Sequence, residues 1–326
     1  MLGAGSWGTT VASLLARRHE VVVWARDPEL STQISRDHVN ERYLKGAALP
    51  ESLQATSDLA EAAGSCDLLV VGVPTHGFRD TLTQVRPVLR PWIPVVSLSK
   101  GLEQGSLLRM TEVAKEELPG HPVAALTGPN IAREIIEGQA AAAVIATQDL
   151  DVAASLQGVL QRGLFRIYTN HDVIGCELGG ALKNVVAIAT GIAQGLSVGD
   201  NTRASVMTRG LGELTRLGVA MGGEAATLYG LTGMGDLIAT CISPHSRNRK
   251  LGEQLGLGRS LEDVLAGSTQ VAEGVRTAQA VYQLAERHGV AMPVCTEVHR
   301  VLSDEIPAAD AYRGLRIEPG HEADPG

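Results

Sequence analysis

The sequence predicts a doubly wound α/β domain over residues 1–171, followed by an all-helical domain over residues 172–305. Three observations support this prediction. The chain has 326 residues, which exceeds the roughly 250–300 residues at which one hydrophobic core usually stops growing. Its first half alternates short β-branched runs with longer helical patterns, as βαβ units of a parallel sheet do. From Asp172 onward the periodicity is helical, and no convincing β run follows.

Apolar runs in the first half are expected to form the strands. Several of them, such as Leu68–Val71, are apolar without alternation, as expected where helices cover both faces of a sheet. Helical stretches such as Trp7–Arg17 and Asp149–Leu160 lie between the runs. The expected strands are Glu20–Trp24, Asp67–Val73, Pro94–Ser97, Val123–Leu126, Ala141–Ala146 and Phe165–Thr169.

The two ends of the sequence depart from this pattern. Only Met1 and Leu2 precede the first glycine-rich loop, whereas a strand usually has about five residues. We therefore expect a truncated first strand, which puts the start of the chain in doubt. Residues 306–326 are rich in Pro, Gly, Asp and Glu, so we expect them to form a disordered tail.

Composition argues against several classes of function. Acidic residues outnumber basic residues by 36 to 28, and the net charge is −8, which argues against binding to nucleic acid or an anionic membrane. The 4 cysteines show no CxxC spacing and no clustered histidine, so we expect neither disulfides nor a metal site. No leader sequence opens the chain, and no apolar run approaches the ~20 residues of a membrane span. A cytoplasmic protein without membrane insertion is expected.

A glycine-rich loop near the start predicts a dinucleotide site. Residues 3–8, GAGSWG, fit the pattern G-x-G-x-x-G and precede a helical run and then a strand. Gly3 would allow a tight turn, Gly5 would let the backbone approach a pyrophosphate, and Gly8 would permit close packing of helix on strand. The helix N-terminus would then face the phosphates. This context predicts a Rossmann-type domain, the alternative being a structural glycine-rich turn.

The end of the second strand bears on cofactor choice. An NAD-selective site would place Asp or Glu there to bind the ribose 2′-hydroxyl, but this chain has Arg26 followed by Asp27. Arg26 can pair with a 2′-phosphate, which favours NADP or the use of both cofactors. A solvated loop arginine is the alternative.

Polar residues also interrupt apolar or glycine-rich sequence further along the chain. Lys100 follows a predicted parallel strand, at the edge where open α/β sheets bind ligands. A surface charge is the alternative for this lysine. Residues 126–130, LTGPN, form another such segment.

Lys183 is the strongest chemical clue in the sequence. It interrupts a helix of small and apolar residues, where an unpaired ammonium would be costly. Desolvation lowers the pKa of a lysine towards the range useful for acid–base chemistry. Asp236 and Thr240 share one helix face at the spacing i, i+4. Snorkelling of Lys183 and helix capping by Asp236 are the alternatives.

A polar segment near residue 246 predicts a phosphate site. Ser246, Arg247 and Asn248 lie on one predicted loop and supply donors suited to a phosphate monoester. A basic solvated loop is the alternative.

The motifs GAGSWG, SKG, TGP, ELGGALKN, GMGDL and SRNR occur in this order along the chain. In this the chain resembles the NAD(P)-dependent glycerol-3-phosphate dehydrogenase family of prokaryotic type, from Leu2 to about Leu302. The resemblance implies a 6-phosphogluconate dehydrogenase-like fold, in which a Rossmann-type domain precedes a helical one. It also implies a homodimer that interconverts dihydroxyacetone phosphate and sn-glycerol 3-phosphate with NAD(P)H, for phospholipid synthesis.

The resemblance also assigns roles to individual residues. Lys183 would be the general acid/base, and Lys100, Asp236 and Thr240 would complete the catalytic group. The implied substrate contacts are Lys100, Gly128, Asn130, Lys183, Asp236, Ser246, Arg247 and Asn248. The implied cofactor contacts are Gly3, Gly5, Ser6, Trp7, Gly8, Arg26, Tyr43, Lys100, Ala132, Arg247, Val271 and Glu273. Asn130 stands where many family members carry Ser or Thr.

Two other functions remain open at this point. A β-hydroxyacid or 3-hydroxyacyl-CoA dehydrogenase also joins a Rossmann-type domain to a helical domain, but the segment from Ser246 to Asn248 suits a small phosphorylated substrate better. A catalytically idle nicotinamide-binding sensor would have no need for both Lys183 and Asp236.

Overall fold

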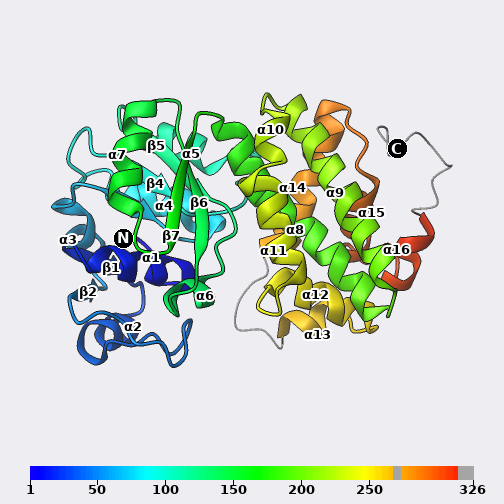
Figure 1. Ribbon diagram of the computed structural model, residues 1–326, viewed down its shortest axis with the longest axis horizontal. Coiled ribbons are helices and arrows are strands. Elements are labelled where there is room, and N and C mark those ends of the chain that lie inside the picture. The colour runs from blue at the N-terminus through cyan, green and yellow to red at the C-terminus, as the bar shows by residue number, and fades with distance from the viewer. Residues whose placement is uncertain (267–272, 315–326) are drawn as a thin grey trace. The chain divides into compact units, whose positions relative to one another are not determined.

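The computed structural model describes residues 1–266 and 273–314 and divides into two compact units, Met1–Val173 and Ile174–Gly326 (Figure 1). The first unit is an α/β fold. Its strands are β1 (Val21–Trp24), β2 (Leu53–Thr56), β3 (Leu69–Val71), β4 (Val95–Ser97), β5 (Val123–Thr127), β6 (Ala141–Ala146) and β7 (Phe165–Asn170). Its helices are α1 (Ser6–Ala16), α2 (Pro28–Thr32), the π-helical turn η1 (Gln33–Asp37), α3 (Leu59–Gly64), α4 (Thr75–Val85), α5 (Met110–Glu117), α6 (Ala132–Ile136) and α7 (Leu150–Leu160).

The strands pair in the order β3-β4-β5-β6-β7, and β1 pairs with β2. Leu2 joins the two groups, because it forms parallel bridges with both Trp24 of β1 and Val71 of β3. Its N–H donates to the carbonyl of Val70 at 2.8 Å, and the N–H of Gly72 donates to the carbonyl of Leu2 at 2.7 Å. Met1 and Leu2 therefore occupy a strand position between β1 and β3, as the short segment before the glycine loop predicts.

The sheet differs from the sequence prediction at two places. The pairing is parallel except between β5 and β6, which run antiparallel, so the sheet is mixed. β2 was not predicted, because its sequence LQAT is short and half polar. Each of the six predicted runs coincides with a strand of the structure to within a few residues at its ends.

Helices cover both faces of this sheet. Successive strand residues point to opposite faces. Val70 therefore packs in the core cluster that includes Val11 of α1 and Leu156 of α7, whereas Leu69 packs in the cluster that includes Phe78 of α4. The predicted doubly wound α/β fold is confirmed for the first unit.

The second unit is helical throughout its described residues, as predicted. Its elements are α8 (Val173–Gly195), α9 (Asp200–Ala220), α10 (Ala225–Leu228), the π-helical turn η2 (Leu231–Gly235), α11 (Asp236–Ile242), α12 (Arg247–Gly256), α13 (Leu261–Ala266), α14 (Glu273–His288), α15 (Pro293–Leu302) and α16 (Ala308–Gly314). α16 lies in the segment that composition predicted to be a disordered tail, and Ala311 of this helix is buried. Residues 315–326 lie outside the described part of the chain.

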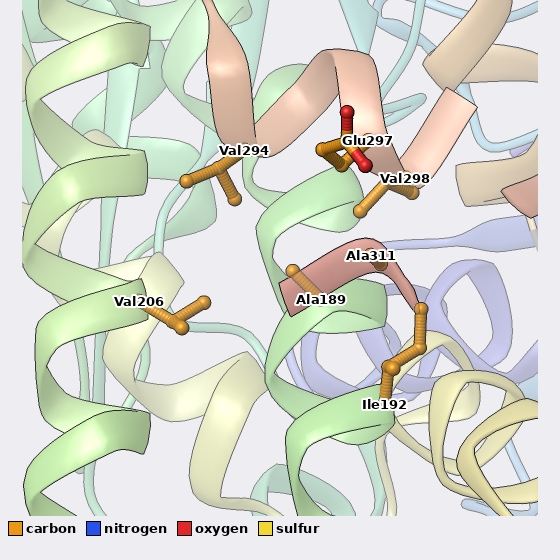
Figure 2. A pocket seen from close by; sticks show the side chains of 7 residues that line it. All are labelled: Ala189, Ile192, Val206, Val294, Glu297, Val298 and Ala311. Carbon is orange, nitrogen blue, oxygen red and sulfur yellow. The ribbon is translucent and has the colours of Figure 1, made fainter. Parts of the chain in front are cut away.

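α8 is the central helix of this unit. Its length and composition would allow it to cross a membrane, and so would those of the stretch Ala225–Ile242, contrary to the expectation that no run approaches this length. However, 94% of the apolar window of α8 is buried inside the protein, as in the core helix of a globular unit. A small apolar cavity lies beside it, lined by Ala189, Ile192, Val206, Val294, Glu297, Val298 and Ala311 (Figure 2).

Candidate active site

The glycine loop of the first unit has room for a ligand at one position and none at two others. Gly3 has a positive φ of 102°, and a Cβ there would lie 2.8 Å from the carbonyl oxygen of Gly72. A Cβ on Gly8 would lie 2.1 Å from the carbonyl oxygen of Gly3, whereas no atom of the described part of the chain lies within 4 Å of a Cβ on Gly5. Gly3 and Gly8 thus fold the loop tightly, and Gly5 faces open space at the N-terminus of α1, where a pyrophosphate would bind.

Two partly buried side chains whose polar atoms are buried support ligand binding in this unit. The ring of Trp7 packs edge-on against Phe165, with ring centroids 5.9 Å apart, and its Nε1 is buried without a hydrogen-bond partner among the described residues. Both amide atoms of Asn130 are also buried and have no partner in residues 1–266 and 273–314. Because unsatisfied buried polar atoms are costly, these groups fit a site that is completed by a polar ligand.

The segment that contains Tyr43 is fixed to the glycine loop by Asn40. The side-chain Nδ2 of Asn40 donates to the carbonyl of Ala4 and to Oγ1 of Thr9, both at 2.9 Å. Its Oδ1 accepts from the N–H of Tyr43 at 3.1 Å. Sequence reasoning missed Asn40, because one Asn in a polar loop gives no signal.

Arg26 and Asp27 differ in their surroundings. Asp27 caps α2 by accepting from the N–H of Glu29 at 3.0 Å, and it pairs with Arg42 at 2.9 Å. Arg26 is exposed and lies two residues after the end of β1. The carboxylate is therefore already engaged within the protein, which leaves the arginine better placed to meet a 2′-phosphate.

Lys100 and Gly128 come together at the carboxyl ends of β4 and β5. Lys100 Nζ donates to the carbonyl oxygen of Gly128 at 2.7 Å. Gly128 has a φ of 122°, and a Cβ there would lie 3.2 Å from Cα of Ala143. Gly128 is thus required by its backbone conformation, and it brings the following residues, including Asn130, to the same edge as Lys100. Ala132 begins α6 and accepts at its carbonyl from Thr10 of α1 at 3.3 Å.

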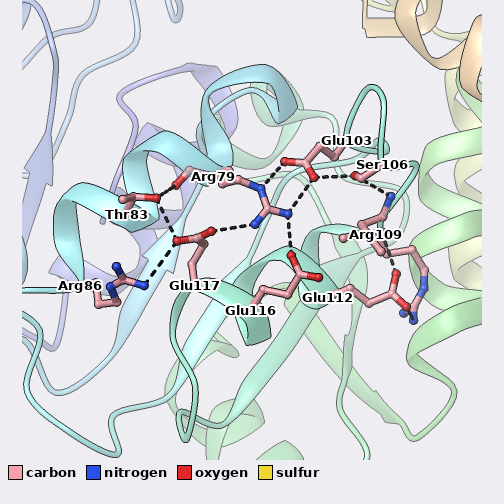
Figure 3. Close-up of polar contacts among 10 residues, drawn as sticks. Arg79, Thr83, Arg86, Glu103, Ser106, Arg109, Glu112, Glu116 and Glu117 are labelled. Carbon is pink, nitrogen blue, oxygen red and sulfur yellow. Dashed lines mark hydrogen bonds and ion pairs between the residues drawn. The ribbon is translucent and has the colours of Figure 1, made fainter.

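The loop after Lys100 is tied to α4 by Arg79 (Figure 3). Arg79 donates to both carboxylate oxygens of Glu103 at 2.8 Å and to Glu116 and Glu117 at 2.7 Å. The bond from Arg79 lowers the pKa of Glu103 and that of Glu117. Arg79 thereby fixes Glu103, three residues beyond Lys100.

The second unit brings a buried lysine, a buried carboxylate and a partly buried hydroxyl into contact. Lys183 and Asp236 are 6% and 2% exposed, and Lys183 Nζ forms an ion pair with Asp236 Oδ1. Lys183 Nζ also donates to Thr240 Oγ1 at 2.8 Å. The hydroxyl of Thr240 donates in turn to the carbonyl of Asp236 at 2.6 Å. The lysine is thus held by partners in the core of the unit and does not snorkel to its surface.

A glycine and a π-helical turn place Asp236 beside Lys183. Gly179 lies one helical turn before Lys183, and a Cβ there would be 2.7 Å from the carbonyl oxygen of Thr232 in η2. η2 ends at Gly235, and α11 begins with Asp236. Since π-helical turns often occur at functional sites, this irregular geometry agrees with a catalytic role for the residue that follows it.

The predicted phosphate segment forms the N-terminus of α12. Ser246 caps this helix by accepting from the N–H of Arg249 at 3.2 Å. The N–H groups of Arg247 and Asn248, the first two of the helix, have no carbonyl four residues back inside it. Arg247 is exposed. The helix dipole, these two N–H groups and the guanidinium together form a site suited to a phosphate.

Asn184, next to Lys183, connects the lysine helix to this turn. Its Oδ1 accepts from Asn248 Nδ2 at 2.9 Å, and Asn248 Oδ1 accepts from the N–H of Gly274 at 3.1 Å. Asn184 was part of the ELGGALKN motif but was not assigned a role. Glu273 begins α14, whereas Val271 lies outside the described residues.

Comparison with known proteins identifies close relatives. A family model described as the NAD-dependent glycerol-3-phosphate dehydrogenase N-terminus matches residues 1–153, and the model of its C-terminus matches residues 172–313. A curated NAD(P)+ glycerol-3-phosphate dehydrogenase 2 from Sphingopyxis alaskensis is 55% identical over 100% of this chain and 98% of its own length. The corresponding enzyme from Mycobacterium avium is 52% identical over 99% of this chain and 95% of its own.

Solved structures agree with these matches. The crystal structure of a glycerol-3-phosphate dehydrogenase from Coxiella burnetii superposes with a TM-score of 0.92 at 36% identity. The match covers 96% of this chain and 97% of that one.

Proposed function

The chain belongs to the NAD-dependent glycerol-3-phosphate dehydrogenase family, and from this premise we propose which residues perform its reaction. The enzyme interconverts dihydroxyacetone phosphate and sn-glycerol 3-phosphate with NAD(P)H. Family membership therefore favours this activity over the β-hydroxyacid and hydroxyacyl-CoA alternatives.

The group formed by the buried Lys183 and Asp236 with Thr240 carries the catalytic assignment. In the direction of reduction, Lys183 donates a proton to the oxygen of the substrate carbonyl as it becomes an alkoxide, and in the reverse direction the neutral lysine is the base. Asp236 compensates the charge of the buried ammonium, and Thr240 fixes the position of Nζ. Positive charge beside the developing alkoxide lowers the barrier further.

Substrate binding is assigned to both units. The N-terminus of α12, with Ser246, Arg247 and Asn248, binds the phosphate group. Lys100, Gly128 and Asn130 contact the remainder of the substrate, and the unpartnered amide of Asn130 supports this assignment.

NAD(P)H supplies the hydride when it is bound. The residues that would hold it are Gly3, Gly5, Ser6, Trp7, Gly8, Arg26, Tyr43, Lys100, Ala132, Arg247, Val271 and Glu273. The open space at Gly5 and the buried Nε1 of Trp7 support the assignment in the first unit. The exposed Arg26 beside an engaged Asp27 supports NADPH as a cofactor.

The roles of the domains and the setting of the enzyme are also proposals. Residues 1–171 form the dinucleotide-binding domain and residues 172–305 form the substrate and catalytic domain. The protein is a cytoplasmic homodimer that supplies glycerol 3-phosphate for phospholipid synthesis. Light scattering on a size-exclusion column tests the dimer.

The activity is tested by following the absorbance of NADPH and of NADH after dihydroxyacetone phosphate is added. We expect oxidation of NADPH, and equimolar formation of glycerol 3-phosphate. Cofactor binding without turnover would instead indicate a nicotinamide-binding sensor.

A further inference from the structure

We propose that Arg249 is a positioning residue that fixes the phosphate-binding turn at the start of α12 relative to Lys183 on α8. It thereby sets the distance between the phosphate site and Lys183, and so selects substrates whose phosphate and reacting carbonyl are separated by that distance. The proposal rests on the functions proposed above for Lys183 and for Ser246, Arg247 and Asn248.

α8 and α12 touch through their backbones. A Cβ on Gly191 of α8 would lie 2.0 Å from the carbonyl oxygen of Arg249, and a Cβ on Gly252 of α12 would lie 2.0 Å from that of Ile188. One turn further, a Cβ on Gly195 would lie 2.3 Å from the carbonyl oxygen of Glu253. Glycines on both helices permit this approach, so a slide of either helix by one residue would place a side chain against a backbone.

Arg249 is buried at this contact and is held from three directions. It is 7% exposed, and its Nε donates to the carbonyl of Ser243, just before the turn, at 3.1 Å. Its Nη1 donates to Gln194 Oε1 of α8 at 2.6 Å and to Glu253 Oε2 at 3.0 Å. Gln194 Nε2 donates to the other oxygen of Glu253 at 3.1 Å. Arg249 therefore links the segment before the turn, the helix after it and the helix that carries Lys183.

A second link lies at the catalytic end of the same contact. Asn248, which begins α12 with Arg247, bonds to Asn184, the neighbour of Lys183. Arg249, the next residue, bonds to Gln194, which lies further along α8, so the start of α12 is attached to α8 at two separate places. Together with the close backbone contact at Gly191 and Gly252, these bonds resist rotation of α12 and hold the direction of its N-terminal N–H groups relative to Lys183.

This attachment matters for a substrate that is gripped at one end and reacts at the other. Binding of the phosphate helps the reaction only if the carbonyl then lies at the proton donor, and a misplacement of about 1 Å can cost about 100-fold in rate. A substrate without a phosphate does not bind to the turn, so its kcat/KM should not depend on the position of the turn.

The test compares dihydroxyacetone phosphate with dihydroxyacetone, which lacks the phosphate. In Arg249→Lys the forked contacts are lost while the charge is kept. We expect kcat/KM for dihydroxyacetone phosphate to fall roughly 10- to 100-fold, mainly through KM. We expect kcat/KM for dihydroxyacetone to change by less than about twofold, so the preference for the phosphorylated substrate should collapse.

Two further variants keep the test decisive. Glu253→Gln replaces Arg249→Lys in the test if the latter does not fold. It keeps the shape of the side chain but removes the negative charge that Arg249 contacts, so it should also reduce the preference for dihydroxyacetone phosphate. Arg259→Gln is the matched control, because Arg259 is exposed beyond α12 and bonds only to Gln254 among the described residues. This control should leave kcat/KM unchanged for both substrates.

The outcomes separate the proposal from the function on which it rests. If the wild-type enzyme shows no preference for the phosphorylated substrate, the assignment of the phosphate turn fails and the inference fails with it. If the preference exists but both variants lose activity equally with both substrates, or lose only thermal stability, then Arg249 is merely structural and the inference is overturned.

Discussion

The partners of Lys183 determine what its removal should do. Lys183→Met keeps most of the side-chain volume but removes the proton donor, so turnover should fall by about 10²- to 10⁴-fold from the loss of general acid catalysis. Loss of the charge beside the alkoxide should add to this. Steady-state rates with dihydroxyacetone phosphate and NADPH measure the effect. Lys183→Arg should restore little, because a guanidinium holds its proton too tightly.

The buried carboxylate makes a stability control necessary. Asp236 is 2% exposed, and removing its cation would cost about 3–5 kcal/mol. The double variant with Lys183→Met and Asp236→Asn should therefore regain much of the lost thermal stability while remaining inactive. A stable Lys183→Met enzyme with turnover within about threefold of wild type would refute the proposed mechanism.

Cofactor choice is also decided by single residues. Arg26→Ala should weaken NADPH binding by roughly 1–3 kcal/mol, as expected for a charge-assisted hydrogen bond to the 2′-phosphate, and should leave NADH binding nearly unchanged. Fluorescence titration with both cofactors measures the difference. An equal loss for both would mean that Arg26 is only a loop residue.

At the level of single residues, the sequence revealed those whose type conflicts with their surroundings. Lys183 stood out because an ammonium in an apolar helix needs a partner, and the structure supplies Asp236 and Thr240. Arg249 did not stand out, since it lies among the polar residues Arg247, Asn248 and Lys250. Its burial depends on the fold of α12 against α8, which no local pattern encodes.

At the scale of elements, the contact between α8 and α12 predicts an unusual response to alanine. Alanine normally stabilises a helix by up to about 1 kcal/mol relative to glycine. In Gly252→Ala, however, the new Cβ would lie 2.0 Å from the carbonyl oxygen of Ile188, and overpacking of this kind typically costs 1–3 kcal/mol. We expect a net loss of stability in denaturant unfolding.

Gly158→Ala is the matched control for this substitution. Gly158 also lies inside a helix, α7, but no atom of the described residues lies within 4 Å of its Cβ position. This variant should be neutral or stabilised by up to about 1 kcal/mol. If the two variants were equally stable, the two helices would not be in backbone contact.

The elements that sequence patterns missed are those formed by context. β2 has the sequence LQAT, which is too short and polar to signal a strand, and it forms by pairing with β1. The π-helical turn η2 depends on the backbone contacts of Gly233 and Gly179. The predicted strands were apolar and β-branched, so their own composition revealed them.

At the scale of the whole molecule, the change of periodicity near Asp172 was the informative signal. An α/β half and a helical half need different residue patterns, and the contacts of the structure divide between Val173 and Ile174. The direction of β6 was not predictable in this way, because an apolar run looks the same in a parallel and an antiparallel pair. The helix α16 was missed because composition alone does not show that Ala311 is buried.

The stability of the whole molecule should rise between pH 6 and pH 8 because of one buried group at Met1. Its amino group donates to the carbonyl of Val22 at 2.8 Å, and burial lowers its pKa from 8.0 to about 6. In this window the unfolded chain binds more protons than the folded chain, so the free energy of unfolding increases with pH. A difference of about two in pKa corresponds to at most roughly 2–3 kcal/mol, and this stability is lost progressively as the pH falls from 8 to 6.

A chain with about four apolar, β-forming residues added before Met1 isolates this contribution. It has no amino group at the buried position, so its stability should depend less on pH between 6 and 8. The extension should also bury apolar area beside β1 and β3, at about 25 cal/mol per Å², and so raise the thermal midpoint, most of all at pH 6. Both chains contain the same 9 histidines, which also titrate in this range, so the difference between the two pH profiles reports on Met1. Parallel profiles with equal midpoints would show that the amino group stays protonated in the fold, and that the segment before Gly3 gains nothing from a longer strand.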